Sequence, residues 1–430
     1  MNSILTKMKI AKLRINYETL LYSLLFLFPI FAISVRHWSS ITFSFLVLLG
    51  IVYYFSSRKK QSIELHKYEK FYLWFLATHF VTFLLSMALN YPERFGDTQF
   101  GNEIRFVLVI PLYFLIIKHK HSLRWLIYGA IISIPASFSF CLHELYVEGR
   151  RFFEGAYSQL FSGPVILIYL ILVVSYYIPR LNKNDKLSWI LLVGLIGIAT
   201  FSIITTTVRA AYIGYMLLAP LLLFMYTKGR FRVVALISLL IAMMVISVNS
   251  QSVKSRMSVA INGLINYIET DNLADPNSRA AASSVGTRLE MWRASPLFVK
   301  DHPLLGVGNG NYQVTMKGYV EQGLIHPSAA LHSHPHNVFV NAAMNRGLLG
   351  LLLTCLVFFW PLYVYIFTYR QNINSARLGI LFVTIIFVIS MSEAAPFNKS
   401  NFIATYLILS LVIFQYHMNE VKKLVKLERY

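Results

Sequence analysis

The chain has 430 residues, of which 56% are hydrophobic, 15% are aromatic and only 13% are charged, and its formal net charge is +20. Soluble domains carry about twice this share of charged residues. Nucleic-acid binding is not expected, because it would need a soluble basic module and the sequence has none. Apolar runs of about 17–25 residues, the length that crosses a bilayer as a helix, recur along the whole chain. The sequence therefore predicts an all-α polytopic membrane protein.

Twelve apolar segments are candidate transmembrane helices. The fourth is short and has Arg105 at its edge, and the tenth is long enough to begin outside the bilayer or to tilt within it. In chain order the segments are 18–35, 38–56, 71–89, 104–117, 123–142, 160–178, 187–204, 208–226, 231–250, 338–368, 378–395 and 402–417.

Lys and Arg are divided unevenly between the two sets of connecting segments. The segments on the side of the N-terminus hold 24 basic residues, whereas the short segments on the opposite side hold seven. Because short cytoplasmic loops collect Lys and Arg, we expect a multi-pass protein with both termini in the cytoplasm. The basic cytoplasmic face would attract anionic membrane lipids.

One connection is much longer than the others and divides the chain into three parts. Residues 1–250 would hold transmembrane helices 1–9, residues 251–335 a large periplasmic loop, and residues 336–430 transmembrane helices 10–12. The loop contains amphipathic stretches such as RLEMWRASPLFVKDHPLLG, with Leu289, Trp292, Leu297, Phe298 and Leu304 available to pack. A long connection of this kind is usually functional or disordered, and the apolar residues favour a folded, functional loop.

Two arginines are candidates for function because charged residues in or near membrane spans are costly. Arg209 lies where two spans meet at a short turn, in SIITTTVRAAYIGYML, and we expect it on the periplasmic side. The alternative is an arginine that holds the helix end at the lipid headgroups. Arg288 begins an amphipathic helix of the large loop and could reach the same space, or could instead pair with Glu290.

Three histidines, His332, His334 and His336, alternate just before the tenth span. Such a segment could bind zinc, but Pro335 interrupts it and no carboxylate lies nearby to orient the imidazoles. The six acidic residues of the loop form no pair that suggests a Mg²⁺ site. We therefore expect no metal or other cofactor.

A third interpretation takes His336 as the first residue of the tenth span, where it could act as a general base near neutral pH. The polar or small residues that follow at three- or four-residue spacing would share one helix face, on which glycines permit close packing. These residues are Asn337, Asn341, Asn345, Gly347 and Gly350.

His336-Asn337, separated by nine residues from Gly347-Leu348-Leu349-Gly350, resembles the signature of the O-antigen ligases of Gram-negative bacteria. RLEMWRASPLFVKDHPLLGVGNGNYQ and TTTVRAAY resemble the loop and the preceding span of the broader superfamily that includes O-antigen polymerases and protein O-oligosaccharyltransferases. The matching motifs lie within about residues 200–350, and the expected topology covers the whole chain.

The resemblance implies a GT-C-like glycosyltransferase architecture and an enzyme of lipopolysaccharide biosynthesis. Such ligases are glycosyltransferases of the bacterial inner membrane. They transfer a polysaccharide from undecaprenyl diphosphate to a sugar hydroxyl of the lipid A-core, on the periplasmic face, without ATP or metal, and the resemblance implies that inner-membrane lipids surround this chain. Arg209, Arg288 and His336 match the functional arginines and the histidine of the family. Cationic guanidinium groups suit a diphosphate leaving group, and a histidine can accept the proton of the acceptor hydroxyl in an inverting displacement.

Further residues are expected to contact substrate or to support the site. Arg346 and Arg105 are candidates for binding phosphate or core sugars, and Asn337 could orient His336. His332 and His334 are either plain loop histidines or contacts to phosphates of the acceptor. An O-antigen polymerase is the nearest alternative, and the histidine motif favours the ligase. In a different class, a transporter or flippase of lipid-linked sugars would bind the diphosphate but would not need His336.

Overall fold

The computed structural model describes residues 16–57, 64–90, 97–182, 184–230, 232–234, 237, 251–269, 281–392 and 399–427. Within these residues the chain is helical and contains no strand, which confirms the predicted fold class. The α-helices are α1 (Tyr17–Ala32), α2 (Trp38–Ser57), α3 (Lys67–Leu89), α4 (Asp97–Glu103), α5 (Arg105–Leu108), α6 (Ile110–Ile116), α7 (Ser122–Leu142), α8 (Gln159–Tyr177), α9 (Lys186–Thr205), α10 (Arg209–Tyr226), α12 (Gln251–Glu269), α13 (Ser284–Arg293), α14 (Ser295–Asp301), α15 (Tyr312–Glu321), α16 (Val338–Phe367), α17 (Ile373–Ser392) and α19 (Ser400–Leu427).

Ten stretches of helix in the described residues are long and apolar enough to cross a membrane, and α1 is a shorter apolar helix. The predicted span 231–250 lies almost wholly outside the described residues. The predicted span 104–117 is not one helix, because α4, α5 and α6 follow one another with breaks at Ile104 and Val109. Together they form an apolar stretch from Gln99 to Ile116.

The core of the bundle lies around α8 and α19, whose apolar side chains are almost all buried. Helix α9 is the most hydrophobic of the candidate spans, but only a few of its side chains are buried, and the same is true of α10. A helix that is apolar on all sides and buried on one side only needs an apolar solvent on the other. The exposure of α9 and α10 therefore fits helices that face lipid.

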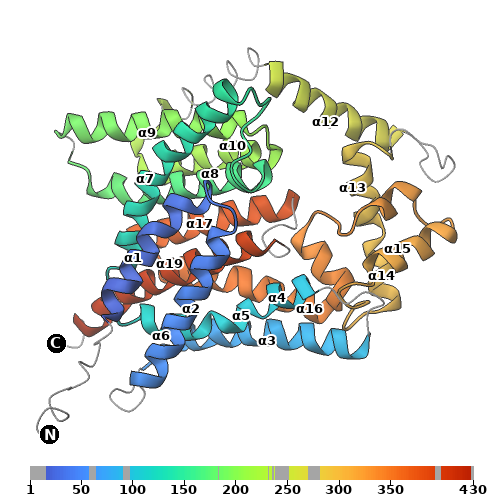
Figure 1. Cartoon of the computed structure of the whole chain (residues 1–430), viewed down its shortest axis with the longest axis horizontal. Coiled ribbons are helices and arrows are strands. Elements are labelled where there is room, and N and C mark those ends of the chain that lie inside the picture. The colour runs from blue at the N-terminus through green and yellow to red at the C-terminus, as the bar shows by residue number, and fades with distance from the viewer. Residues whose placement is uncertain are drawn as a thin grey trace, which may run out of the picture.

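The beginning of α1 and the end of α19 lie at one end of the bundle, and α13, α14 and α15 gather at the other end (Figure 1). Contacts agree with this arrangement, because Lys422 near the end of α19 pairs with Glu69 in the first turn of α3 at 2.5 Å. At the opposite end of α3, Asn90 donates to the carbonyl oxygen of Gly306 at 3.0 Å. The large loop therefore covers the end of the bundle away from the two terminal helices.

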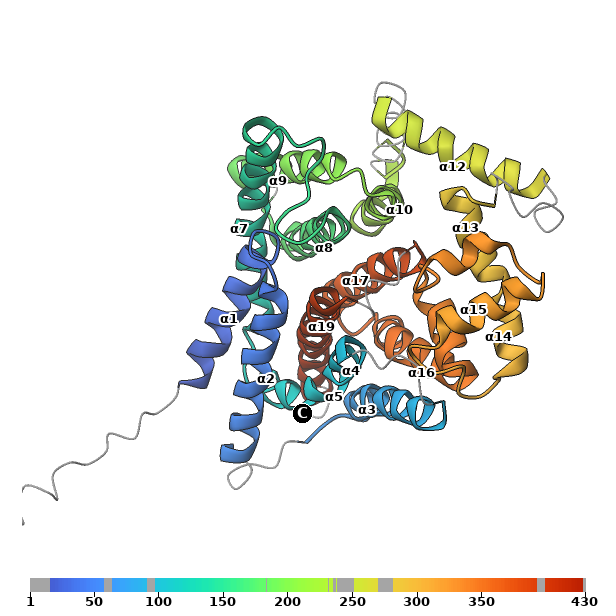
Figure 2. The same cartoon turned by 45° about the vertical axis from the view of Figure 1, so that its right-hand side comes forward.

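The loop has a hydrophobic core of its own, formed by α13, α14, α15 and the beginning of α16. Its centre includes Met291, Phe298, Tyr312 and Met344, which are buried. Figure 2 shows α14 beside α16, and α12 lying farther from the bundle. The prediction of packed amphipathic helices is confirmed in this part, with one correction: Leu304 is 69% exposed, because it follows the end of α14 in a turn.

Candidate active site at the start of α16

Helix α16 begins at Val338, where the predicted span 338–368 begins, so His336 lies two residues before the helix and is not its first residue. Asn337 is the N-cap residue, and its side-chain oxygen accepts hydrogen bonds from the backbone N–H groups of Phe339 at 2.9 Å and Val340 at 3.1 Å. The amide nitrogen of the same side chain donates to the carbonyl oxygen of Met391 in α17 at 3.3 Å. Asn337 thus fixes the start of α16 against the end of α17, and His336 precedes the helix.

His336 has a φ of 52°, in the left-handed region that residues other than glycine rarely adopt. Such a conformation costs about 1–3 kcal/mol and is found most often at functional sites, where the surrounding structure enforces it. Only two other described non-glycine residues have a positive φ, namely His37 and Thr207. Thr207 lies two residues before Arg209, so strained backbone occurs at or near two of the three predicted reactive residues, His336 and Arg209.

The three histidines gather at this point. The ring centroid of His336 lies 4.5 Å from that of His334 and 5.2 Å from that of His332. The indole nitrogen of Trp292 on α13 donates to the carbonyl oxygen of Pro335 at 2.8 Å, which ties the segment to the loop helices. Among the described residues, no three His, Cys, Asp or Glu side chains are arranged to hold a metal ion.

Arg288 belongs to the same cluster. The pKa of the His332 imidazole lies below its usual value, first because the ring is partly buried and then because His336 and Arg288 add positive charge nearby. Arg288 is on α13, whose N-terminus is capped by the Ser283 side chain. The structure therefore brings Arg288, His332, His334 and His336 together.

Glu290 joins the loop helices and pairs with Arg293, the second arginine of α13. Its buried carboxylate accepts hydrogen bonds from the Tyr267 hydroxyl at 2.6 Å and the backbone N–H of His326 at 3.1 Å, and it pairs with Arg293 at 3.5 Å. Burial and the nearby carboxylate raise the pKa of Tyr267 to about 12. Arg293 is therefore part of the scaffold of the loop.

Arg209 is the first residue of α10, and no side chain caps this helix. Helices α10 and α17 are antiparallel: Arg377 lies over the ring of Tyr226, and a Cβ added at Gly214 would lie 3.0 Å from Ile385. Arg209 is five residues before Gly214, which is roughly 7.5 Å along α10. Met391 is six residues after Ile385, which is roughly 9 Å along α17 in the same direction, because the two helices are antiparallel.

Since Asn337 is bonded to Met391, Arg209 and the start of α16 lie at a similar height at the same end of the bundle. A side-chain contact between Arg209 and His336 does not follow from this geometry. The prediction that both face one cavity remains a prediction.

The predicted continuous helix face after Asn337 is wrong at Gly347. This residue has φ 64° and ψ −165°, which no helix contains, and α16 consists of two helical parts that meet there. The ring of Phe339 lies 5.5 Å from that of Phe358, whereas a straight helix would separate these residues by roughly 28 Å. The first part of α16, residues 338–346, is therefore folded back beside the second part.

The segment from Pro303 to Gly308 seals this fold. Four backbone hydrogen bonds of 2.8–3.2 Å join the two segments. In one direction, Leu348 donates to the carbonyl oxygen of Pro303 and Leu349 to that of Leu304. In the other direction, Val307 donates to the carbonyl oxygen of Met344 and Gly308 to that of Asn345. A Cβ at Gly347 would lie 2.4 Å from the Leu304 carbonyl carbon, and one at Gly306 would lie 2.4 Å from that of Asn345. Gly350 also allows close packing, against the Cβ of Arg346 one turn earlier. The two matching motifs DHPLLGVG and GLLG therefore dock on each other.

Arg346 is 3% exposed and lies in a buried polar network inside the bundle. Its guanidinium is 3.2 Å from the carboxylate of Glu103 on α4, 2.9 Å from a ring nitrogen of His79 on α3, and 3.2 Å from the hydroxyl of Thr354. The sequence interpretation identified neither His79 nor Glu103. Their position within or beside apolar segments was the available signal, since charged residues there rarely lack a partner.

Arg105 likewise contacts protein groups. It donates to the carbonyl oxygens of Gly101 at 3.1 Å and Ser400 at 2.5 Å and to the hydroxyl of Ser40 at 3.2 Å, so it joins α4, α19 and α2. Nothing in the described residues places Arg105 or Arg346 in the histidine cluster. Substrate contacts of these two arginines remain predictions, and their protein contacts indicate a structural role.

Comparison with known proteins bears on the same part of the chain. An uncharacterized protein of Haemophilus influenzae (strain ATCC 51907 / DSM 11121 / KW20 / Rd) is 21% identical over 365 residues, which cover 83% of this chain and 86% of the relative. Residues 194–355, which include Arg209, the loop helices and the fold of α16, match the family model described as O-antigen ligase. This segment of the multi-pass membrane protein is thus similar to the domain that the O-antigen ligase model describes.

Proposed function

We propose that the protein is an O-antigen ligase of the inner membrane. It would transfer a polysaccharide from undecaprenyl diphosphate to a sugar hydroxyl of the lipid A-core on the periplasmic face, by inverting glycosyl transfer without a metal. The observation that carries the proposal is His336, which has a left-handed conformation immediately before the capped end of α16, within the segment that matches the family model. Its ring lies next to that of His332, whose pKa Arg288 lowers.

In this mechanism His336 accepts the proton of the acceptor hydroxyl as the oxygen attacks the anomeric carbon. The bond between that carbon and the diphosphate oxygen breaks, and the leaving group carries the electron pair away as undecaprenyl diphosphate. Asn337 supports the step by fixing the backbone beside His336 through three hydrogen bonds. The lowered pKa of His332 limits the positive charge around the base, because His332 remains neutral over a wider pH range.

Charge on the diphosphate would be stabilised by Arg288 and Arg209. Arg288 lies in the histidine cluster, and its planar guanidinium can donate two hydrogen bonds to phosphate oxygens. Arg209 is at the N-terminus of α10, where a cation is unfavourable beside the positive end of the helix dipole unless an anion binds there as well. The combination of a helix N-terminus and an arginine suits a phosphate group.

The proposed orientation has both termini in the cytoplasm. It rests on the 24 basic residues of the segments on the N-terminal side, and on the position of the loop helices at the opposite end of the bundle (Figure 1). The histidine cluster would then face the periplasm, where a lipid-linked polysaccharide and the lipid A-core are both present.

The first experiment is lipopolysaccharide gel profiling of a chromosomal deletion complemented with variants. We expect the deletion to leave unmodified lipid A-core while long undecaprenyl-linked chains accumulate, and we expect His336→Ala not to restore ligation. His302→Ala is the matched control, because His302 is an exposed histidine of the same loop, at the end of α14. If single repeats still reach the core in the deletion strain and only chain length is lost, the protein is a polymerase.

A second experiment separates binding from chemistry with the purified chain. His336→Ala should bind undecaprenyl diphosphate-linked donor nearly as well as the wild type but should not transfer it, whereas Arg209→Ala should weaken both binding and transfer. Full ligation by a stable His336→Ala protein would contradict the role of the base and would favour a transporter of lipid-linked sugars.

A further inference from the structure

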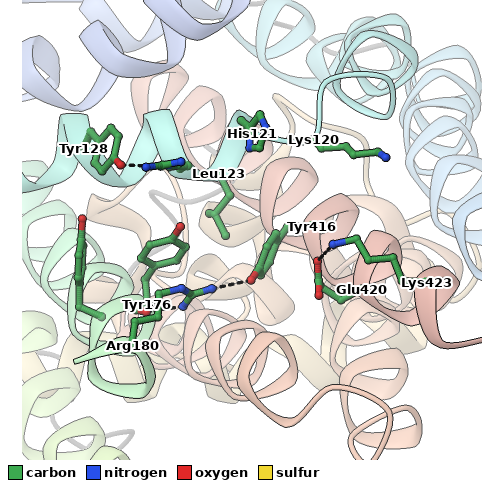
Figure 3. A pocket seen from close by; sticks show the side chains of 11 residues that line it. Lys120, His121, Leu123, Tyr128, Tyr176, Arg180, Tyr416, Glu420 and Lys423 are labelled. Carbon is green, nitrogen blue, oxygen red and sulfur yellow. Dashed lines mark hydrogen bonds and ion pairs between the residues drawn. The ribbon is translucent and has the colours of Figure 1, made fainter. Parts of the chain in front are cut away.

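A second polar site lies at the end of the bundle opposite the histidine cluster. A cavity of about 470 Å³ opens between the beginning of α7, the end of α8 with the short 3₁₀ helix Ile178–Arg180, and the end of α19 (Figure 3). Its volume is in the range typical of sites that bind small molecules. None of the residues proposed for glycosyl transfer lines it.

The cavity is strongly basic. Among the described residues, four cationic side chains line it, Lys120, Arg124, Arg180 and Lys423, and one carboxylate, that of Glu420. Lys423 is 2.5 Å from Glu420, so this pair is neutral overall, and the described part of the wall offers no carboxylate to the other three cations. The charge of the site therefore favours an anion.

Tyrosines hold both arginines in place. The guanidinium of Arg180 lies 3.9 Å from the ring centroid of Tyr176, and it donates to the Tyr416 hydroxyl at 2.9 Å and to the Tyr176 carbonyl oxygen (Figure 3). Arg124 donates through Nε to the Tyr128 hydroxyl at 2.5 Å. These contacts use only part of the five N–H groups of each guanidinium, so both arginines retain donors for phosphate oxygens in a fixed orientation.

The position of the cavity at the ends of three apolar helices narrows the choice of anion. Trp125, next to Arg124 on α7, is 37% exposed, and tryptophan at the end of a span is typical of the level of the lipid headgroups. Leu123 contributes an apolar wall. A site with these features meets the headgroup of a lipid that lies alongside the bundle more readily than a solute that must arrive from the water.

We propose that this cavity binds the phosphate headgroup of an anionic phospholipid in the leaflet at the end of the bundle where α1 begins and α19 ends. By the proposed orientation this is the cytoplasmic leaflet, and basic pockets between helices on that side suit such headgroups. The site is independent of glycosyl transfer, and its occupation ties α7, α8 and α19 together through one ligand.

The test measures lipid retention by the full-length protein. The chain is purified in detergent with equal amounts of phosphatidylglycerol and phosphatidylcholine, and the bound lipids are counted by native mass spectrometry. We expect the wild type to retain phosphatidylglycerol in preference. Arg180→Ala should reduce this retention about fivefold, the effect of one cation close to an anionic lipid, and the double variant with Arg124→Ala should reduce it further.

Lys120→Ala tests the site with a substitution that should not disturb folding, because the Lys120 side chain is exposed and lies in a turn before α7. We expect this variant to retain less phosphatidylglycerol and to have the melting temperature of the wild type. Arg370→Ala is the matched control for charge, since Arg370 is exposed in the turn between α16 and α17 and does not line the cavity. Equal retention by wild type and by all three cavity variants would overturn the proposal. Full displacement of the lipid by inorganic phosphate or glycerol phosphate alone would also overturn it, in favour of a soluble ligand.

Discussion

Replacement of Gly347 by alanine tests whether the fold of α16 holds the histidine cluster in position. The glycine has φ 64° and ψ −165°, a combination that is essentially restricted to glycine and costs other residues about 1–3 kcal/mol. The added Cβ would lie 2.4 Å from the Leu304 carbonyl carbon, 2.5 Å from its oxygen and 2.6 Å from the Leu305 nitrogen. These are backbone atoms, which cannot rotate away, and overpacking of this kind costs about another 1–3 kcal/mol.

We therefore expect Gly347→Ala to lower the free energy of unfolding by about 2–6 kcal/mol, the sum of these two effects. It should also reduce ligation at least tenfold at temperatures where the variant is folded, because a shift of the first part of α16 moves Asn337 and His336, and small displacements at a reactive centre are costly. The assays are a thermal melt of the purified protein and the lipopolysaccharide gel profile of the complemented strain.

Gly197→Ala is the matched control, since Gly197 lies in the middle of α9 and a Cβ added there meets no atom within 4 Å. Alanine in such a helix position should leave stability unchanged or raise it by up to about 1 kcal/mol. Gly306→Ala is a second test variant, because Gly306 lies in the segment that packs against Gly347. The two substitutions disturb the same contact, so the loss of stability in the double variant should be smaller than the sum of the two single losses. A Gly347→Ala protein that melts and ligates like the control would refute the reasoning.

Three further predictions concern residues around the site. Asn337→Ala should lower stability by about 1 kcal/mol through loss of the N-cap, and Asn337→Asp, which keeps the acceptor of the cap but not the donor to Met391, should melt closer to the wild type. Glu103→Ala should destabilise the protein by about 3–5 kcal/mol because Arg346 is left without its buried partner, and a double-mutant cycle with Arg346→Met should reveal coupling between them. Arg288→Ala should raise the pKa of His332, as measured by NMR of labelled histidine; unchanged titration would argue against their proximity.

The sign of the pH dependence at His332 follows from its lowered pKa. Between that pKa and the ordinary value near 6.5, the unfolded chain binds more protons than the folded one. The stability of the folded protein therefore falls as the pH drops below about 6.5, and it levels off below the folded pKa. Arg288→Ala should weaken this fall, and a melting temperature with the same pH dependence in both proteins would contradict it.

The sequence was sufficient to predict the helical class and most spans. The reason is that a bilayer requires an apolar stretch of a certain length in helical form, and this length can be counted in the sequence. The first part of α16 is apolar enough to pass as the beginning of a long span, and hydropathy alone does not distinguish a straight helix of 30 residues from two parts folded side by side. The difference depends on one residue, Gly347, whose positive φ becomes necessary only when the segment from Pro303 to Gly308 lies against it.

The same reasoning explains which site residues could be found and which could not. Short sequence motifs contain His336, Arg288 and the glycines of α16, so these residues could be identified from the spacing within the motifs. His79 and Glu103 are single polar residues on separate helices, and only packing brings them to Arg346. This network lies directly behind the fold of α16, since Ser86, two turns after His79 on α3, has its hydroxyl 2.9 Å from the carbonyl oxygen of Asn345. The buried ion pair of Arg346 and Glu103 thus supports the folded first part of α16, which begins two residues after His336, so this pair can influence the position of His336 through the backbone.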